Sequence, residues 1–127
     1  MDFGTKVHYY LETIDLHNPV IDKIESPFKE KIEALLKSDL IKNIKEAKVY
    51  QEHEFIYELE EEEKHGVIDL MLEYPNHIDI IDYKLKNILD EAYIKQLNGY
   101  REYINSISNK EVNLYLYSII DEKYEKL

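Results

Sequence analysis

Two apolar segments separated by a short turn constrain the fold of this chain more than any other feature of its sequence. Residues 67–74 and 78–84 are rich in branched and aromatic side chains, and Pro75 and Asn76 lie between them. Runs of this length on either side of a turn predict two neighbouring antiparallel β-strands. Asp69 in the first run and Asp82 in the second lie among apolar residues, and a carboxylate is rarely buried there unless a partner neutralises it.

The two aspartates are expected to face each other. A turn centred between Pro75 and Asn76 pairs residues that are equally distant from it, and Asp69 and Asp82 meet this condition. Their Cβ atoms would then lie about 4.5–5.5 Å apart on neighbouring strands. The alternation of side chains along a strand places Lys84 on the same face as Asp82.

This group of side chains suits the hydrolysis of a phosphodiester. Facing carboxylates destabilise a sheet unless a cation neutralises them, and hard cations such as Mg²⁺ bind carboxylate oxygens. A metal bound there can polarise a phosphodiester and activate water, while a neighbouring lysine orients the water or balances phosphate charge. In the alternative, structural interpretation, Asp82 and Lys84 form a surface ion pair and Asp69 is solvated near the turn. The pattern of residues alone does not decide between the two interpretations.

Helical spacing and strand-like segments follow one another along the rest of the chain. Helices are predicted over residues 4–14, 27–36, 40–44 and 90–107, and further strands over residues 50–59 and 112–119. Ser26 is the expected N-cap of the second helix, with Pro27 in its first turn. The polar segment that begins with four glutamates at Glu60 and ends at Gly66 is expected to be a solvated hairpin loop, because adjacent acids repel. The order α-α-β-β-β-α-β predicts an α/β domain whose mixed sheet is flanked by helices.

Composition restricts the functional classes. The chain has 127 residues and no cysteine, so it fits one domain and excludes disulfides, thiol catalysis and cysteine-held clusters. It has no signal-peptide pattern and no apolar run of the roughly 18 residues that span a bilayer, so we expect a cytoplasmic protein without membrane contact. Its formal net charge of −11 opposes strong binding to DNA by this chain alone. That charge fits a domain that relies on the basic surface of a partner.

Four short motifs occur in an order and spacing that resemble the PD-(D/E)xK nuclease superfamily. They are Gly4-Thr5-Lys6-Val7-His8, Gly66-Val67-Ile68-Asp69, Ile81-Asp82-Tyr83-Lys84 and Tyr93-x-x-Gln96-Leu97-x-x-Tyr100. Within the superfamily, the chain resembles the RecB-type exonuclease domain at the C-terminus of AddA (RexA) helicase–nuclease subunits. Residues 54–57 and 114–118 resemble the first and last core strands of that domain, so the likeness covers nearly the whole chain.

The resemblance implies a role for each matched residue. His8, Asp69 and Asp82 would bind a Mg²⁺ or Mn²⁺ ion together with the backbone carbonyl of Tyr83. The catalytic residues would be Asp69, Asp82, Lys84 and Gln96, with Lys84 as the catalytic lysine and Gln96 orienting water or phosphate. Glu54 and Tyr100 would support the site, Glu54 near the metal and Tyr100 on the neighbouring helix. The family commonly follows its lysine with threonine and aspartate, where this chain has Leu85 and Lys86.

The resemblance also implies an activity and partners. A restriction-endonuclease-like catalytic core over residues 48–127, preceded by a helical part over residues 1–47, would form a single nuclease domain. It would act as a metal-dependent DNA exonuclease on single strands at double-strand breaks. A helicase domain or the subunits of an AddAB-type complex would feed it, because the chain has no Walker-A glycine loop of its own. The chain would be either an excised domain or a stand-alone relative.

Two alternatives stay open at this point. The first is a nuclease-like fold without catalysis that serves as an acidic docking module for a partner protein, although an intact set of site residues opposes it. The second is a nuclease of the same superfamily that acts in restriction or CRISPR adaptation. The absence of cysteine opposes the iron–sulfur branch of those relatives.

Overall fold

The helices and strands occur in an α/β order. This computed structural model describes residues 2–85 and 91–127. The elements are α1 (Phe3–Thr13), α2 (Phe28–Leu36), the 3₁₀-helices η1 (Asp39–Ile41) and η2 (Ile44–Glu46), β1 (Lys48–Leu59), β2 (Glu62–Glu73), β3 (His77–Lys84), α3 (Glu91–Asn105), β4 (Glu111–Ser118) and β5 (Lys123–Lys126). No helix among these residues has the length and apolar character needed to cross a membrane.

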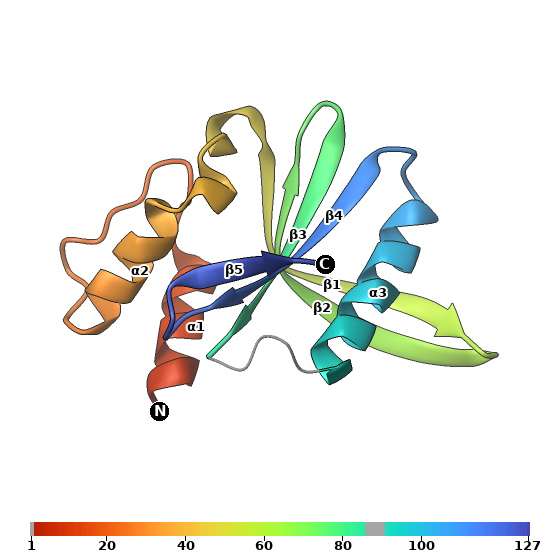
Figure 1. Cartoon of the computed structure of the whole chain (residues 1–127), viewed down its shortest axis with the longest axis horizontal. Helices are drawn as coiled ribbons and strands as arrows, with labels where there is room; N and C mark the ends of the chain where they lie inside the picture. The colour runs from red at the N-terminus through yellow and green to blue at the C-terminus, as the bar shows by residue number, and fades with distance from the viewer. Residues whose placement is uncertain (1, 86–90) are drawn as a thin grey trace.

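The strands form a five-stranded mixed sheet in the order β1-β2-β3-β4-β5. All neighbouring strands are antiparallel except β3 and β4, which are parallel because the chain between them returns through α3. Figure 1 shows α1 and α2 on one side of the sheet and α3 on the other. The predicted α/β class and the mixed sheet flanked by helices are therefore confirmed.

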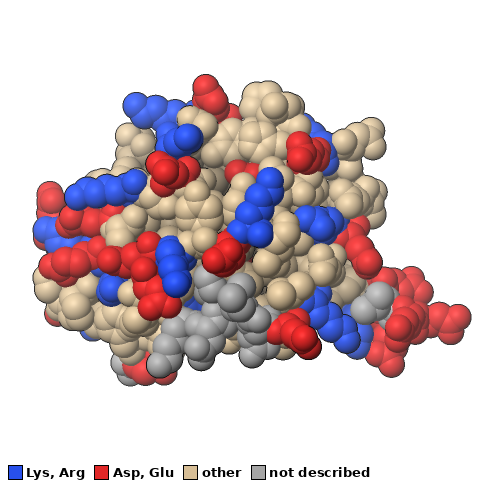
Figure 2. Space-filling view, viewed as in Figure 1, with Lys and Arg blue, Asp and Glu red and all other residues tan. Residues whose placement is uncertain are grey.

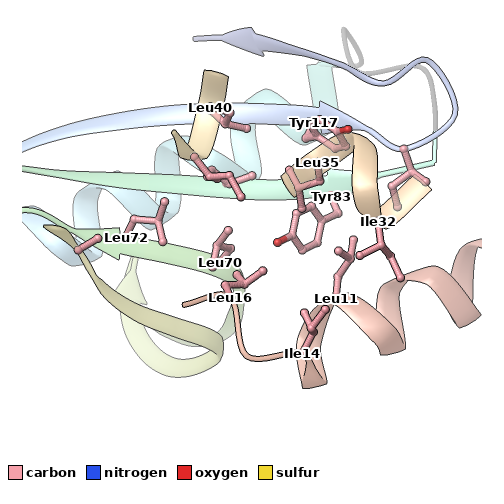
Figure 3. Close-up of a cluster of buried hydrophobic side chains, with 14 of the residues drawn as sticks. Leu11, Ile14, Leu16, Ile32, Leu35, Leu40, Leu70, Leu72, Tyr83 and Tyr117 are labelled. Atoms are coloured by element: carbon pink, nitrogen blue, oxygen red, sulfur yellow. The ribbon is translucent and has the colours of Figure 1, made fainter. Parts of the chain in front are cut away.

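A separate hydrophobic cluster covers each face of the sheet. On the α1–α2 face, fully buried leucines and isoleucines of the helices meet buried residues of the central strands, as Figure 3 shows. The labelled members are Leu11, Ile14, Leu16, Ile32, Leu35, Leu40, Leu70, Leu72, Tyr83 and Tyr117. On the other face, Leu97, Tyr100 and Ile104 of α3 pack against Ile80 and Leu114. Both faces of the central strands are thus removed from water, which explains their nearly continuous apolar sequence.

The first helix begins at a capping aspartate and ends beside β1. The Asp2 carboxylate accepts a hydrogen bond from the Thr5 backbone N–H at 2.8 Å, which satisfies one of the free donors of the first turn. Val7 and Leu11 of α1 are buried one turn apart. His8 follows Val7, so its side chain lies at the edge of the buried face rather than within it.

The register of the β2–β3 hairpin agrees with the sequence-based prediction. Leu70 pairs with Ile81 and Glu73 with Ile78, and the members of each pair are equally distant from the turn. The ladder ends at Leu70 and Ile81, so Asp69 and Asp82 are the first residues beyond its last pair, at the open end of the hairpin.

The predicted hairpin is present, but its loop over residues 60–66 is too long. β1 and β2 continue to a two-residue turn at Glu60 and Glu61, whose φ angles are 52° and 65°. Positive φ at both central residues suits a tight hairpin, because its twist matches that of the strands. The acidic charges are tolerated because strand residues alternate between faces and Lys64 pairs with Glu62 at 2.9 Å.

Three smaller predictions also need correction. Pro27, not Ser26, occupies the N-cap position of α2, and the Ser26 hydroxyl instead donates a hydrogen bond to Glu30 at 2.6 Å. The single short helix expected over residues 40–44 is instead two 3₁₀-helices, η1 and η2. Strand β5 was not predicted, because its polar sequence pairs with β4 only as an exposed edge. The predicted start of α3 at residue 90 lies outside the described residues.

The close packing of the hairpin against α3 predicts a strong effect of Gly66→Ala. An added Cβ would overlap the Phe55 ring, with Cε1 at 2.7 Å. That ring cannot move freely because it stacks on Tyr103 at 4.3 Å. We expect a loss of about 1–3 kcal/mol in the free energy of unfolding, measured by urea denaturation.

Gly99→Ala is the matched control. Its added Cβ would approach only the end of Tyr57, with the hydroxyl oxygen at 3.4 Å. Alanine also favours the interior of a helix over glycine, so stability should stay the same or rise. Equal losses in the two variants would contradict this account of the hairpin packing.

Candidate metal centre

The pairing between β1 and β2 is interrupted where Glu52 and Asp69 come to the same level. The residues on either side pair in register, but these two form no ladder pair. Glu52 has a left-handed φ of 52°, which is uncommon for a residue other than glycine. Side chains two residues apart normally share one face of a strand. Across the break they do not: Ile68 packs in the α3 cluster, whereas Leu70 packs in the α1–α2 cluster. The break therefore directs two carboxylates to one place at the edge of both clusters.

Helix α1 brings an imidazole to the same place. His8 Nε2 lies 3.3 Å from Asp69 Oδ2, and His8 Nδ1 lies 3.7 Å from Glu52 Oε1. One ligand atom from each of His8, Glu52 and Asp69 lies within 4.8 Å of the others. The Gln51 side chain donates hydrogen bonds of 2.8 Å to the backbone carbonyls of Leu11 and Ile14, and these fix β1 against the end of α1.

The two aspartates predicted to face each other lie together. Asp69 Oδ2 accepts a hydrogen bond of 2.8 Å from the backbone N–H of Tyr83. Tyr83 directly follows Asp82, so this bond holds the Asp69 carboxylate beside Asp82. The carboxyl groups of Asp69 and Asp82 lie close enough for each to change the pKa of the other. Both residues are buried, with 9% and 3% of their surface exposed. The third carboxylate is Glu52, and the charge of Asp69 is close enough to raise its pKa.

Burial and crowding change the protonation of this group. Burial, together with the neighbouring Asp69, raises the pKa of Asp82 to about 7. Burial and the charges of Asp69 and Glu12 likewise raise the pKa of Glu52 to about 7. Burial also opposes ionisation of Asp69, but hydrogen bonds with His8 and Asp82 bring its pKa below the ordinary value. The hydrogen bond to Asp69 raises the pKa of His8.

Lys84 and α3 complete the group on the other face of the sheet. Lys84 Nζ lies 2.9 Å from Asp82 Oδ2 and donates a hydrogen bond of 3.4 Å to Gln96 Oε1. Tyr100 is buried one turn after Gln96 on α3. A cleft of about 890 Å³ runs along these residues, between the β1–β2 hairpin and α3, and His8 and Asp69 also line it. The structure therefore brings together His8, Asp69, Asp82, Tyr83, Lys84, Gln96 and Tyr100.

Glu54 does not belong to this group, contrary to its predicted place near the metal. Its side chain is exposed and lines a separate hollow with Ile56 and Val67. The reason is the break at Glu52, after which His53, Phe55 and Tyr57 face α3. Side chains alternate along a strand, so Glu54 faces away from α3. Sequence reasoning missed Glu52 because regular alternation gives no sign of a left-handed residue within a strand. Its position opposite Asp69 in the hairpin register is the one signal that could have found it.

The side chains fit a hard divalent cation. Three carboxylates and one imidazole are the ligand types that Mg²⁺ and Mn²⁺ accept. Glu52 Oε1 is shielded from solvent and accepts no hydrogen bond from any residue that the structure describes. A buried acceptor without a donor is costly, and a cation beside it would remove that cost. The residues that would hold the ion are His8, Glu52, Asp69 and Asp82.

Comparison with known proteins gives one similar region. Over 80 residues the chain is 38% identical to an ATP-dependent helicase/nuclease subunit of Clostridium beijerinckii. This stretch covers 57% of the chain but only 6% of that protein, so the chain is similar to a small part of its relative. No family model matches the chain.

The difference between the two glutamates of β1 predicts a difference in metal binding. Mn²⁺ in large excess over its dissociation constant should raise the Tm of the wild-type protein by several degrees. Glu52→Gln should lose most of this shift, whereas the matched variant Glu54→Gln should keep it. Differential scanning calorimetry with and without Mn²⁺ measures both. The opposite order, with Glu54→Gln the more damaging change, would contradict the placement of the site.

The raised pKa of Asp82 predicts how stability depends on pH without metal. The folded protein holds the Asp82 proton up to about pH 7, whereas the unfolded chain releases it near the ordinary value for aspartate. Protonation of Asp82 therefore stabilises the folded protein at low pH, and this stabilisation is lost as the pH rises from the ordinary pKa of aspartate to about 7. In EDTA at pH 8, Asp82→Asn should be more stable than the wild type by roughly 1–4 kcal/mol, and the difference should shrink toward pH 5.

Addition of Mn²⁺ at pH 8 supplies the control for this prediction. The wild type should gain stability and Asp82→Asn should gain little, because the variant has lost a ligand. If the wild type were more stable than Asp82→Asn in EDTA at every pH, the raised pKa of Asp82 would not be the cause of the pH dependence.

Proposed function

We propose that this chain is the nuclease part of a helicase–nuclease and hydrolyses phosphodiester bonds of DNA with Mg²⁺ or Mn²⁺. The observation that carries the proposal is the convergence of His8, Asp69 and Asp82 with Lys84 in one cleft. The same residues form the motifs that resemble the PD-(D/E)xK superfamily. The similarity to a helicase/nuclease subunit supports the proposal.

Each residue has a chemical role in this proposal. A bound metal supplies Lewis-acid polarisation of the phosphate and a lower pKa for its water. The ion would be held by His8, Glu52, Asp69 and Asp82, and the backbone carbonyl of Tyr83 would be a further ligand. The Asp69 carboxylate also fixes the backbone of Tyr83 through its hydrogen bond.

The remaining two residues act on the substrate. The Lys84 ammonium faces the phosphate, balances its charge and orients the attacking water. Gln96 keeps that ammonium in place through its side-chain oxygen and presents its amide group to the cleft. Attack by water needs no covalent intermediate on the protein.

The charge of the molecule is consistent with a partner that binds most of the DNA. The formal net charge is −11, and Figure 2 shows acidic side chains spread over the visible face and gathered on a projection at its right edge. The β1–β2 hairpin ends there, with Glu60, Glu61, Glu62 and Glu63 at its tip. Phosphate binding by this chain alone would be weak and sensitive to salt. A helicase motor that delivers single strands to the cleft would supply the missing basic surface.

Hydrolysis of an end-labelled single-stranded DNA in Mn²⁺ tests the proposal. The wild type should cleave weakly, and less as salt rises, whereas Asp82→Ala should show no cleavage. Lys84→Met should lose roughly 10²-fold or more in rate, yet keep the Mn²⁺-induced rise in Tm, since Lys84 is not a ligand. This difference separates loss of metal from loss of chemistry.

The alternative function is an acidic docking module for a partner protein, and the acidic surface is the observation that favours it. A wild type that neither cleaves DNA nor gains stability from Mn²⁺ would support that alternative. Cleavage by Asp82→Ala at the wild-type rate would contradict the proposed site, because the activity would then come from elsewhere.

A further inference from the structure

The ammonium group of Lys84 lies over the ring of Tyr93, with Nζ 4.1 Å from the ring centroid. Tyr93 and Gln96 are three residues apart in α3, so they share one face of the helix. Gln96 Oε1 accepts a hydrogen bond of 3.4 Å from the same ammonium, and Asp82 Oδ2 approaches it from β3 at 2.9 Å. Two side chains of one helix face and one carboxylate of the sheet thus surround the ammonium.

We propose that Tyr93 is a positioning residue for Lys84, whose ammonium is held in the cleft by the face of the aromatic ring. A cation within about 6 Å of an aromatic centroid is attracted by the negative face of the ring. The attraction grows when water is excluded, and the Lys84 side chain is only 20% exposed. This inference rests on the proposed function, in which Lys84 acts on the phosphate.

The Tyr93 ring supplies a contact with Lys84 that does not depend on a metal ligand or on a long hydrogen bond. A lysine side chain is a point charge on a flexible four-carbon stem, so one contact does not fix its direction. The Asp82 carboxylate is also a candidate ligand, and a bound cation would compete with the ammonium for its charge. The Gln96 contact is long for a hydrogen bond. The Tyr93 ring binds no metal, so its contact with Lys84 stays available in the metal-bound protein.

Two substitutions separate the ring face from the hydroxyl group and from packing. Tyr93→Phe keeps the aromatic face and removes the hydroxyl. Tyr93→Leu keeps an apolar side chain that favours helix but removes the face. Both variants should retain the Mn²⁺-induced rise in Tm, which shows that they fold and that the metal ligands are intact.

The first readout is independent of nuclease activity. The ring current of Tyr93 should shift the Lys84 ε-methylene proton signals upfield, and Lys84→Met identifies those signals by their absence. We expect the shift in the wild type and in Tyr93→Phe, and its loss in Tyr93→Leu. An unchanged shift in Tyr93→Leu, or its loss in Tyr93→Phe, would overturn the proposed contact.

The second readout is the rate of DNA hydrolysis. Tyr93→Leu should lower kcat about five- to tenfold with KM within twofold, and Tyr93→Phe should restore most of the rate. Equal kcat in the wild type and Tyr93→Leu would overturn the positioning role. If the wild type does not cleave DNA, the proposed function fails, and the proton shifts still decide whether the ring holds the ammonium.

Discussion

Three carboxyl groups from three neighbouring strands, those of Glu52, Asp69 and Asp82, meet at one partly shielded place. Their repulsion is the constraint that the surrounding structure must satisfy. Without metal, the repulsion is relieved because Glu52 and Asp82 take up protons and Asp69 accepts hydrogen bonds. The pKa of Glu52 and of Asp82 rises to about 7, while Asp69 stays ionised against His8 and the Tyr83 backbone N–H. A divalent cation would meet the same constraint with all three groups ionised.

The rest of the architecture assembles this site from both faces of the sheet. Helix α1 packs on one face and supplies His8, and helix α3 packs on the other and supplies Gln96 beside Lys84. The parallel pairing of β3 with β4 keeps the strand that carries Asp82 in the middle of the sheet. A buried central strand has little freedom, so the positions of Asp82 and Lys84 are set by the core of the domain.

The sequence predicts the mixed sheet and the facing aspartates because both follow from short-range rules. The turn at Pro75 and Asn76 fixes the register, and the register fixes Asp69 against Asp82. The sequence predicts a hairpin between β1 and β2 but not the start of β2 at Glu62, because four glutamates suggest a loop, whereas packing of Phe55 over Gly66 favours strands. Glu52 was missed for a related reason: a left-handed residue within a strand is set by tertiary contacts and leaves no local pattern.

A crystal structure of the protein grown with Mn²⁺, with data collected at the manganese absorption edge, would test the proposed metal centre most directly. We expect one strong anomalous peak at coordination distance from carboxylate oxygens of Asp69 and Asp82 and from a nitrogen of His8, with Glu52 turned toward it. An anomalous map with no peak among these side chains, at an Mn²⁺ concentration that saturates the thermal shift, would contradict the proposed metal centre.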